Sequence, residues 1–108
     1  MGELTRARRM AAVRAAMEGA GVDVLLLSVG ADLPWLTGYE AMPLERLTML
    51  VVPVDAIATL VVPEMEAPRV GDTEDIFVLR PWNESEYPVS IVAGLMDARG
   101  PLRAAPGR

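Results

Sequence analysis

The spacing of apolar and polar positions changes several times along the chain, and each change predicts an element. Over residues 3–19, Met10, Val13 and Met17 recur at helical spacing, with alanines in the turns between them. Gly21 follows where a helix commonly ends in left-handed geometry. This pattern predicts an N-terminal helix. Its charged residues are expected to face outward: Arg8, Arg14 and Glu18.

The next two patterns predict strands. Residues 22–28 form a nearly continuous apolar run, which is typical of a strand buried on both faces. Two copies of Leu-Val-Val-Pro, at 50–53 and 60–63, predict a hairpin with arms at 47–52 and 59–62. A proline ends each arm, where it disturbs strand pairing least.

The remaining segments are shorter. Residues 32–38 predict one helical turn closed by a glycine, and residues 64–70 a second short helix that Pro68 weakens. A strand is expected at 76–79 and a last helix from Pro88. This order of elements predicts an α/β fold, with a mixed sheet of about four strands and flanking helices.

Size and charge narrow the class of protein. The chain has 108 residues, enough for one small domain, which we expect at 1–97 with a tail or linker at 98–108. The formal net charge of −5 argues against a nucleic-acid partner. No apolar stretch approaches the ~20 residues needed to span a bilayer. We therefore expect a soluble cytoplasmic protein with no membrane partner.

Two residue types are missing, and their absence excludes several chemistries. The chain contains no cysteine and no histidine. It can build neither a disulfide, nor a thiolate or imidazole metal site, nor a Ser–His–Asp triad. An enzyme made from this chain alone would have to work with carboxylates, arginines and hydroxyls.

The carboxylates are the first candidate site. Glu64 and Glu66 flank one methionine, and Asp72, Glu74 and Asp75 crowd a single turn. Oxygen ligands of this kind hold Mg²⁺ or Ca²⁺, but the spacing fits no EF-hand loop. We expect an ordinary acidic surface turn.

A second candidate lies before the predicted hairpin. Arg46, preceded by Glu45, could grip the carboxylate of a substrate or of a neighbouring chain, or it could form a plain surface charge pair. Trp35 and Tyr39 could form an aromatic wall beside a cleft, or they could be ordinary packing. Trp82 is expected to plug the core. The residues alone leave these alternatives open.

Several segments together resemble the N-terminal domain of the pita-bread metallopeptidases, the family of aminopeptidase P, prolidase and creatinase. They are Gly-Val-Asp-Val-Leu-Leu-Leu at 21–27, Asp-Leu-Pro-Trp-Leu-Thr-Gly-Tyr at 32–39, and the arginine and hairpin arm at 45–53. Pro-Glu-Met-Glu at 63–66 and Arg-Pro-Trp at 80–82 are also similar. The resemblance covers roughly residues 6–96 and implies a creatinase/prolidase-type domain with a ribonuclease-H-like layer.

The chain departs from these relatives in two ways. Their catalytic domain holds two divalent metals, such as manganese or cobalt, on two Asp, one His and two Glu, and no position here corresponds to those ligands. Their N-terminal domain also continues after its last helix into another strand and a linker, where this chain has residues 97–108. We therefore expect a truncated domain that lacks its last strand, and no cofactor in this chain.

The resemblance also implies roles for individual residues. In intact relatives the N-terminal domain builds the oligomer and overhangs a neighbouring subunit's active site, where an arginine at the start of the hairpin reaches the substrate carboxylate. That position falls on Arg46, with Glu45, Trp35 and Tyr39 near the same rim. These four are the expected substrate- or interface-facing residues, and no catalytic residue is expected.

The leading hypothesis is a non-catalytic N-terminal domain of an Xaa-Pro metallopeptidase-like protein. It would serve oligomerisation and substrate gating when joined to a catalytic metallopeptidase domain, and it would self-associate as a homodimer or larger species. The alternatives are a stand-alone binding or regulatory module and a self-associating structural remnant without activity.

Overall fold

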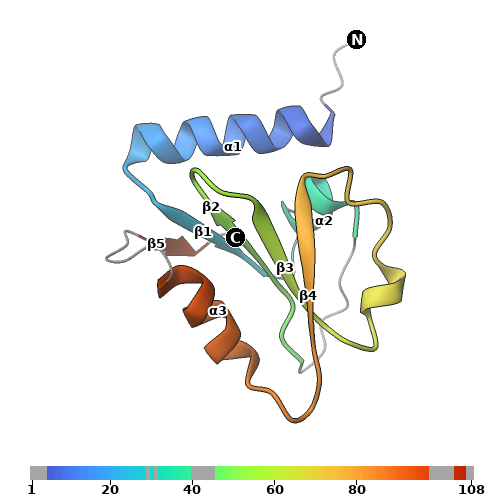
Figure 1. Ribbon diagram of the computed structural model, residues 1–108. Helices are drawn as coiled ribbons and strands as arrows, with labels where there is room; N and C mark the ends of the chain where they lie inside the picture. Colours follow the sequence, from blue (N-terminus) through green and yellow to red (C-terminus); the bar gives the residue numbers. More distant parts are fainter. Residues whose placement is uncertain (1–4, 29, 31, 40–45, 98–103, 107–108) are drawn as a thin grey trace.

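A computed structural model of the chain describes residues 5–28, 30, 32–39, 46–97 and 104–106. Within these residues lie three helices, one short 3₁₀ turn and five strands (Figure 1). The helices are α1 (Arg6–Ala20), α2 (Asp32–Thr37), α3 (Pro88–Asp97) and the 3₁₀ turn η1 (Ala67–Arg69). The strands are β1 (Val24–Leu27), β2 (Met49–Pro53), β3 (Ala58–Pro63), β4 (Phe77–Trp82) and β5 (Ala104–Pro106).

The ends of α1 follow from its sequence. The Thr5 hydroxyl accepts a hydrogen bond from the backbone N–H of Arg8 at 3.2 Å, which satisfies one of the free donors of the first turn. At the other end Gly21 has a φ of 72°, the left-handed geometry that glycine adopts at no steric cost. The predicted helix is confirmed, and Gly19 lies inside it rather than at its end.

The strands form one mixed sheet in the order β4-β3-β2-β1-β5. Strands β1, β2 and β3 pair antiparallel, whereas β3 with β4 and β1 with β5 pair parallel. The hairpin is confirmed, and Pro53 and Pro63 are the last residues of its arms. The expected absence of a last strand is wrong, because Ala104–Pro106 pairs with Val24–Leu26 on the far side of β1.

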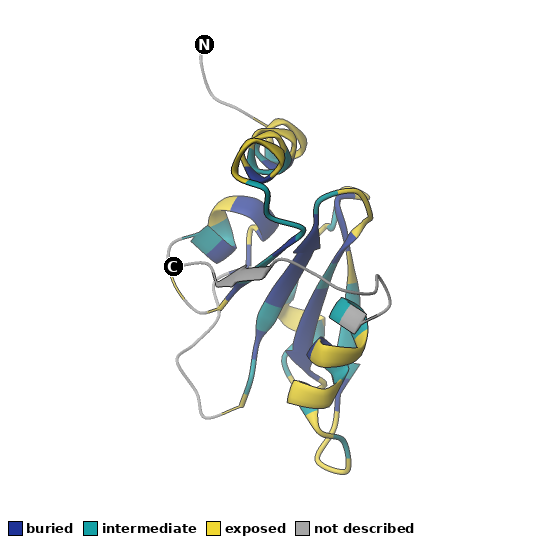
Figure 2. Ribbon diagram, turned by 90° about the vertical axis from the view of Figure 1, so that its left-hand side faces the viewer, coloured by how far each residue is buried: buried dark blue, intermediate teal, exposed yellow. Residues whose placement is uncertain are grey.

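The helices cover both faces of this sheet. Helices α1 and α2 pack on one face, over Leu50, Leu60 and Phe77, and α3 packs on the other, over Val51 and Val61. Figure 2 shows the buried strands lying between helices whose outer sides are exposed. The predicted α/β class is confirmed. Burial on both faces explains why the strands are continuous apolar runs rather than alternating ones.

One arginine joins three separate segments at the N-terminal end of α1. The guanidinium of Arg6 donates to the carbonyl oxygens of Thr37 and of Asp72, the latter at 2.7 Å, and forms an ion pair with Glu74. Gly38 passes beneath it with a φ of 74°, and a Cβ there would lie 2.9 Å from Arg6 Nη1. We call this set of contacts the Arg6 anchor. It fixes α1 to the exit of α2 and to the loop before β4.

Two local predictions need correction. Residues 64–70 form a turn and the 3₁₀ turn η1 instead of a helix, since Pro68 supplies no backbone donor to continue one. Arg14 does not face outward: its Nε donates to the Pro53 carbonyl at 3.2 Å, and its Nη2 donates to that of Ala56. The side chain thus ties α1 to the turn between β2 and β3.

Candidate functional site

The carboxyl ends of the two parallel strands β3 and β4 lie side by side. Glu64, just after β3, donates its backbone N–H to the carbonyl of Trp82, the last residue of β4, at 2.8 Å. The loops at 64–66 and 83–87 therefore leave the sheet together, at the end where ligands commonly bind in parallel α/β sheets. Arg46 reaches the same end from the segment that leads into β2.

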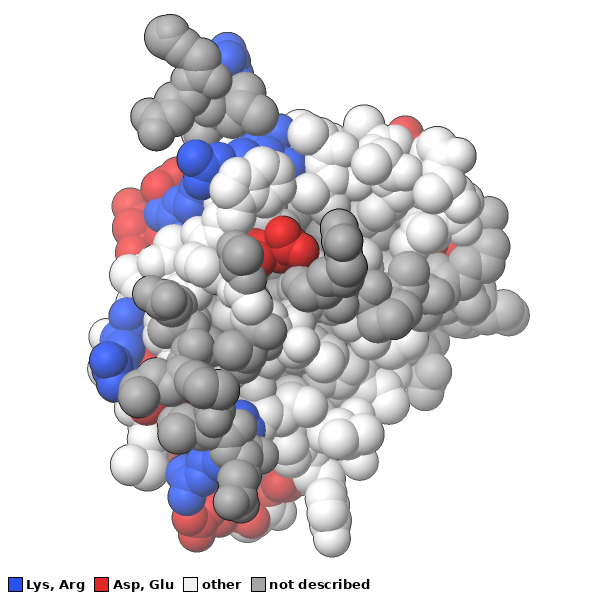
Figure 3. Space-filling model, turned by 180° about the vertical axis from the view of Figure 1, so that it is seen from behind, with Lys and Arg blue, Asp and Glu red and all other residues white. Residues whose placement is uncertain are grey.

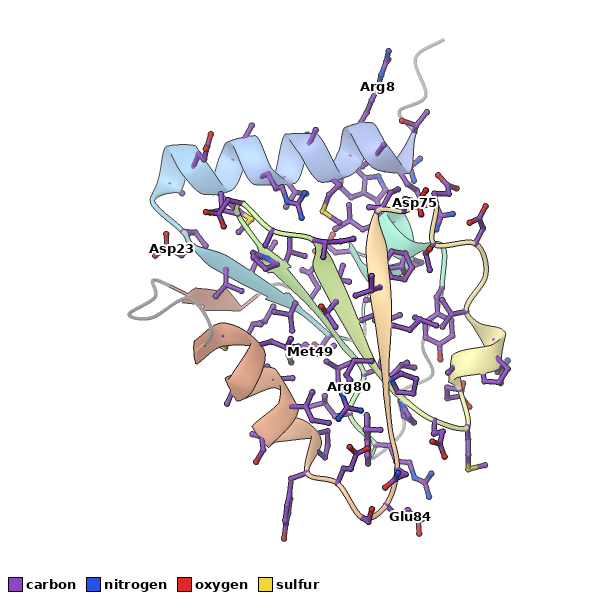
Figure 4. The ribbon with its side chains drawn as sticks, viewed as in Figure 1. Arg8, Asp23, Met49, Asp75, Arg80 and Glu84 are labelled. Atoms are coloured by element: carbon purple, nitrogen blue, oxygen red, sulfur yellow. The ribbon has the colours of Figure 1, made fainter. Side chains whose placement is uncertain are left out.

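Arg46 is held at this end by two weak partners. Its Nη2 forms an ion pair with Glu84 Oε1 at 2.7 Å, and its Nη1 lies 3.4 Å from Met65 Sδ. The Arg46 side chain is 41% exposed and that of Glu84 is 81% exposed. Figure 4 shows Glu84 at the end of the loop that follows β4. An exposed ion pair of this kind stabilises the fold by at most about 1 kcal/mol, so a ligand can replace it.

A hollow of about 180 Å³ opens between these side chains. Its walls come from the start of the hairpin and from the two loops. The lining residues are Arg46, Glu64, Met65, Trp82, Asn83 and Glu84. We call this space the Arg46 hollow. It combines one guanidinium, two carboxylates, an amide and two apolar walls.

Trp82 forms the rigid wall of the Arg46 hollow. The residue is 8% exposed, packs with Val61 and Val92 beneath α3, and donates its indole Nε1–H to the carbonyl of Leu47 at 2.9 Å. A buried indole whose N–H is satisfied in this way is both well packed and fixed in orientation. The predicted core role of Trp82 is confirmed, and the residue also shapes the hollow.

The loop that carries Glu84 is braced internally. Asn83 Oδ1 accepts hydrogen bonds from the backbone N–H and the hydroxyl of Ser85, at 3.0 and 2.6 Å. Glu86 accepts from the backbone N–H of Asn83 at 3.0 Å and from Arg80 at 2.8 Å. The hydrogen bond from Arg80 and then that from Asn83 lower the pKa of Glu86 below its ordinary value. This bracing presents Glu84 to Arg46 from a defined turn.

Tyr39 lies in the core and not on the rim of the Arg46 hollow. It is 5% exposed, and its hydroxyl donates to Glu66 Oε1 at 3.0 Å. Burial, then the hydrogen bond and the negative charge of Glu66, raise the pKa of the phenol above its ordinary value. Tyr39 thereby ties the exit of α2 to the loop after β3, two residues beyond Glu64.

This raised pKa makes stability depend on alkaline pH. An unfolded chain loses the phenol proton near pH 10, whereas the folded protein keeps it to higher pH. The contribution of Tyr39 is therefore complete below about pH 10 and is lost as the pH rises through the folded-state pKa. We expect the stability advantage of the native protein over Tyr39→Phe, measured by urea unfolding, to shrink between about pH 9 and pH 12. Glu66→Gln should weaken this trend, and an advantage that stays constant with pH would contradict the assignment.

Trp35, the other aromatic candidate, lies away from the Arg46 hollow. Trp35 is 42% exposed, and the guanidinium of Arg9 lies 5.5 Å from the centre of its ring while donating to its carbonyl oxygen at 2.9 Å. Neither Trp35 nor Tyr39 lines the Arg46 hollow. Glu45, the fourth predicted residue, lies outside the described residues. The structure thus leaves Arg46 as the predicted residue that faces a hollow.

The acidic turn at 72–75 has an internal role. Asp72 Oδ1 accepts a hydrogen bond from the backbone N–H of Glu74 at 2.9 Å, and Glu74 belongs to the Arg6 anchor. Among the described residues no three carboxylates are arranged to hold a metal ion. Figure 3 shows acidic and basic groups side by side along one border of the molecule, in keeping with such pairs.

A larger hollow of about 720 Å³ lies between α1 and the turn between β2 and β3. Ala7, Ala11 and Ala15 form its helical side, and Arg14 crosses it to the backbone carbonyls of the turn. Burial lowers the pKa of Arg14 below its ordinary value, and the negative charge of Asp55 opposes that effect. The Arg14 guanidinium in this hollow is therefore already occupied by hydrogen bonds that hold the fold together.

Sequence reasoning did not bring four members of the hollow together with Arg46: Glu64, which it considered only as a carboxylate of the acidic candidate site, Met65, Asn83 and Glu84. A signal for the first two existed in the Pro-Glu-Met-Glu segment at 63–66, which follows a buried strand. Glu84 gave no local signal, since its role comes from the parallel pairing of β3 and β4. That pairing joins positions that the sequence does not connect.

A family model matches this chain over residues 9–103, and its description is the creatinase/prolidase N-terminal domain. The chain belongs to the creatinase/prolidase N-terminal domain family. Its sequence is 42% identical, over 60 residues, to a probable dipeptidase PepE of Mycobacterium bovis. That alignment covers 56% of this chain and 16% of the relative.

Solved structures show the same fold. The dipeptidase PepE of Mycobacterium ulcerans superposes with a TM-score of 0.73 at 34% identity, covering 86% of this chain and 27% of that one. The N-terminal domain of an Xaa-Pro dipeptidase from Lactobacillus brevis gives 0.80 at 22% identity, covering 91% and 75%. This creatinase/prolidase N-terminal domain thus spans about a sixth of the length of the curated dipeptidases that it matches.

No helix within the described part of the chain is long and apolar enough to cross a membrane.

Proposed function

We propose that this chain is the non-catalytic N-terminal domain of an Xaa-Pro dipeptidase-like metallopeptidase. In that role it contributes contacts between subunits and positions Arg46 over a neighbouring active site, where the guanidinium orients the carboxylate of the substrate. The two divalent metals, such as manganese or cobalt, and the bond-breaking chemistry would belong to the catalytic domain. The family and the similarity to dipeptidases support this assignment.

The single observation that carries the proposal is the placement of Arg46. It lies at the carboxyl ends of two parallel strands, beside a hollow, and its ion-pair partner is 81% exposed. A planar guanidinium forms two parallel hydrogen bonds to a carboxylate, which fixes the orientation as well as the position of the bound group. Orientation of this kind speeds a reaction without any proton transfer by Arg46 itself.

The test joins this chain to a catalytic domain. In a chimera, the chain replaces the corresponding N-terminal segment of the mycobacterial dipeptidase PepE, and turnover of an Xaa-Pro dipeptide is measured with and without Arg46→Ala. We expect KM to rise about 10–100-fold with kcat nearly unchanged, because a hydrogen bond to a charged group is worth about 1.5–3 kcal/mol. Arg46→Lys should fall between, since it keeps the charge and loses the fork.

The matched control is Arg69→Ala. The exposed side chain of Arg69 also forms an ion pair, to Glu66 at 3.8 Å, but it does not line the Arg46 hollow. Its replacement should leave KM unchanged. Equal KM values for the Arg46→Ala chimera and its parent would overturn the substrate role. A chimera that sediments as a monomer would overturn the role in subunit contacts.

The second candidate function is a stand-alone binding module. One observation favours it: described residues of this domain are enough to line the Arg46 hollow. Under both functions Arg46 faces a ligand.

A further inference from the structure

We infer that the Arg46 hollow binds a free α-amino acid with a small apolar side chain, as a zwitterion. This inference rests on the ligand-facing role of Arg46 in the proposed function, and it concerns a ligand of this chain alone, because the C-terminal nitrogen of an Xaa-Pro dipeptide lies in the peptide bond and carries no ammonium. The ligand's carboxylate would lie on Arg46, its ammonium between Glu64 and Glu84, and its side chain against Met65 and Trp82.

The charges around the hollow exclude a simple anion as the preferred ligand. One guanidinium stands against the two carboxylates of Glu64 and Glu84, so the lining carries a net negative charge at neutral pH. A carboxylic acid without an amine would add a third negative charge beside these two groups. A zwitterion adds none, because each of its two charges meets a partner.

The ion pairing of the side chains in the hollow also favours a zwitterion. Glu84 already takes the place that a ligand carboxylate would need on Arg46, at 2.7 Å. The carboxylate of Glu64 is exposed, and it has no hydrogen bond or ion pair within the described segments. When a ligand carboxylate displaces Glu84 from Arg46, the ligand's own ammonium supplies a new partner for Glu84 and a first one for Glu64. Three ion pairs then replace one.

The dimensions and the walls set the size of the ligand. A water molecule takes about 30 Å³ in the liquid, so a hollow of about 180 Å³ has room for roughly six waters. That is the scale of a small amino acid and lies well below the range of about 300–1,000 Å³ that larger ligands occupy. Met65 and the indole of Trp82 leave an apolar wall for the side chain, and Trp82 is fixed by Leu47.

The test uses the full chain, labelled with ¹⁵N, and follows the two indole N–H signals by NMR. The probes are L-valine, 3-methylbutanoate, which lacks only its amine, and isobutylamine, which lacks only its carboxylate. We expect L-valine to shift the Trp82 indole signal saturably, with a Kd on the order of 1–10 mM, typical of exposed ion pairs. Each of the other two probes should bind at least about tenfold more weakly. The Trp35 signal is an internal control, since Trp35 does not line the hollow.

Substitutions then assign the contacts. Arg46→Gln and Glu64→Gln should each weaken L-valine binding about tenfold, because each removes one charge; Glu64→Gln also keeps the size of the side chain, whereas Arg46→Gln shortens it. Arg8→Gln is the matched control: Arg8 projects from α1 away from the sheet (Figure 4), and it should leave the Kd unchanged.

Two results would overturn the inference. If 3-methylbutanoate binds as tightly as L-valine, the hollow takes a plain carboxylate; the zwitterion assignment fails and the proposed role of Arg46 stands. If no probe shifts the Trp82 signal at concentrations up to 50 mM, the hollow is not a binding site of this chain alone. The KM measurement on the chimera then decides the proposed function separately.

Discussion

Replacing Trp82 by alanine should cost the domain about 3–5 kcal/mol of its free energy of unfolding, measured by urea denaturation. The residue is 8% exposed and belongs to the buried cluster between α3 and the sheet. Its removal leaves a cavity beside Val61 and Val92 and deprives the Leu47 carbonyl of its indole donor. A small domain has a total stability of about 5–15 kcal/mol, so this loss brings it close to unfolding at room temperature.

Two variants separate the causes of that loss. Trp82→Phe keeps an aromatic ring in the buried site but removes the N–H donor and part of the packing, so it should cost less than Trp82→Ala, about 1–2 kcal/mol. Trp35→Ala removes the same side chain from a site that is 42% exposed, and it should cost under about 1 kcal/mol. If Trp35→Ala destabilises the protein as much as Trp82→Ala, the burial difference between the two indoles is not what holds the fold.

The second large effect is expected at the Arg6 anchor. Arg6→Ala removes hydrogen bonds to two backbone carbonyls and the ion pair to Glu74 in one step. The Arg6 side chain is only 16% exposed, so solvent screens these contacts poorly. We expect a loss of about 2–3 kcal/mol in urea denaturation, the usual value of hydrogen bonds to a charged group whose partners are left partly buried.

The control for Arg6 lies two residues away on the same helix. Arg8→Ala removes an exposed guanidinium from α1, and it should change stability by less than about 0.5 kcal/mol. Equal effects of the two substitutions would show that helix propensity, and not the anchor, sets the stability of α1. A further check is Gly38→Ala, whose added Cβ would lie 2.9 Å from Arg6 Nη1. Its cost should fall in the Arg6→Ala background, where only the strain of a positive φ remains.

The fold was predictable wherever local pattern and burial agree. Continuous apolar runs fixed β1 and the hairpin, and Gly21 and Pro88 marked helix boundaries, because each acts through its own backbone geometry. Strand β5 was missed because Ala104–Pro106 carries little side-chain signal of its own. This segment is a strand because its backbone pairs with β1, and the local sequence pattern does not predict that pairing.

The candidate site was predictable only in part. Arg46 was named as a candidate from its place before the hairpin and from the family resemblance, with a surface charge pair as the alternative; its side chain lines a hollow and pairs with Glu84. Its partner Glu84 is 38 residues away in sequence and meets it only because β4 lies beside β3. Tyr39 was expected near the same rim as Arg46, but its ring lies in the core. Its hydroxyl donates to Glu66 there, so the ring is buried without leaving the hydroxyl unpaired. Spacing along the chain does not reveal such choices.

The Arg6 anchor also sets an order of events during synthesis. The arginine lies at the start of α1, whereas its ion-pair partner Glu74 is 68 residues further on. At about 5–20 residues per second, the ribosome makes Arg6 several seconds before it makes Glu74. The first helix of this domain therefore stays loosely docked on the nascent sheet until the loop before β4 has emerged. The Arg6 guanidinium is among the first side chains made, whereas its contacts to Asp72 and Glu74 are among the last to form.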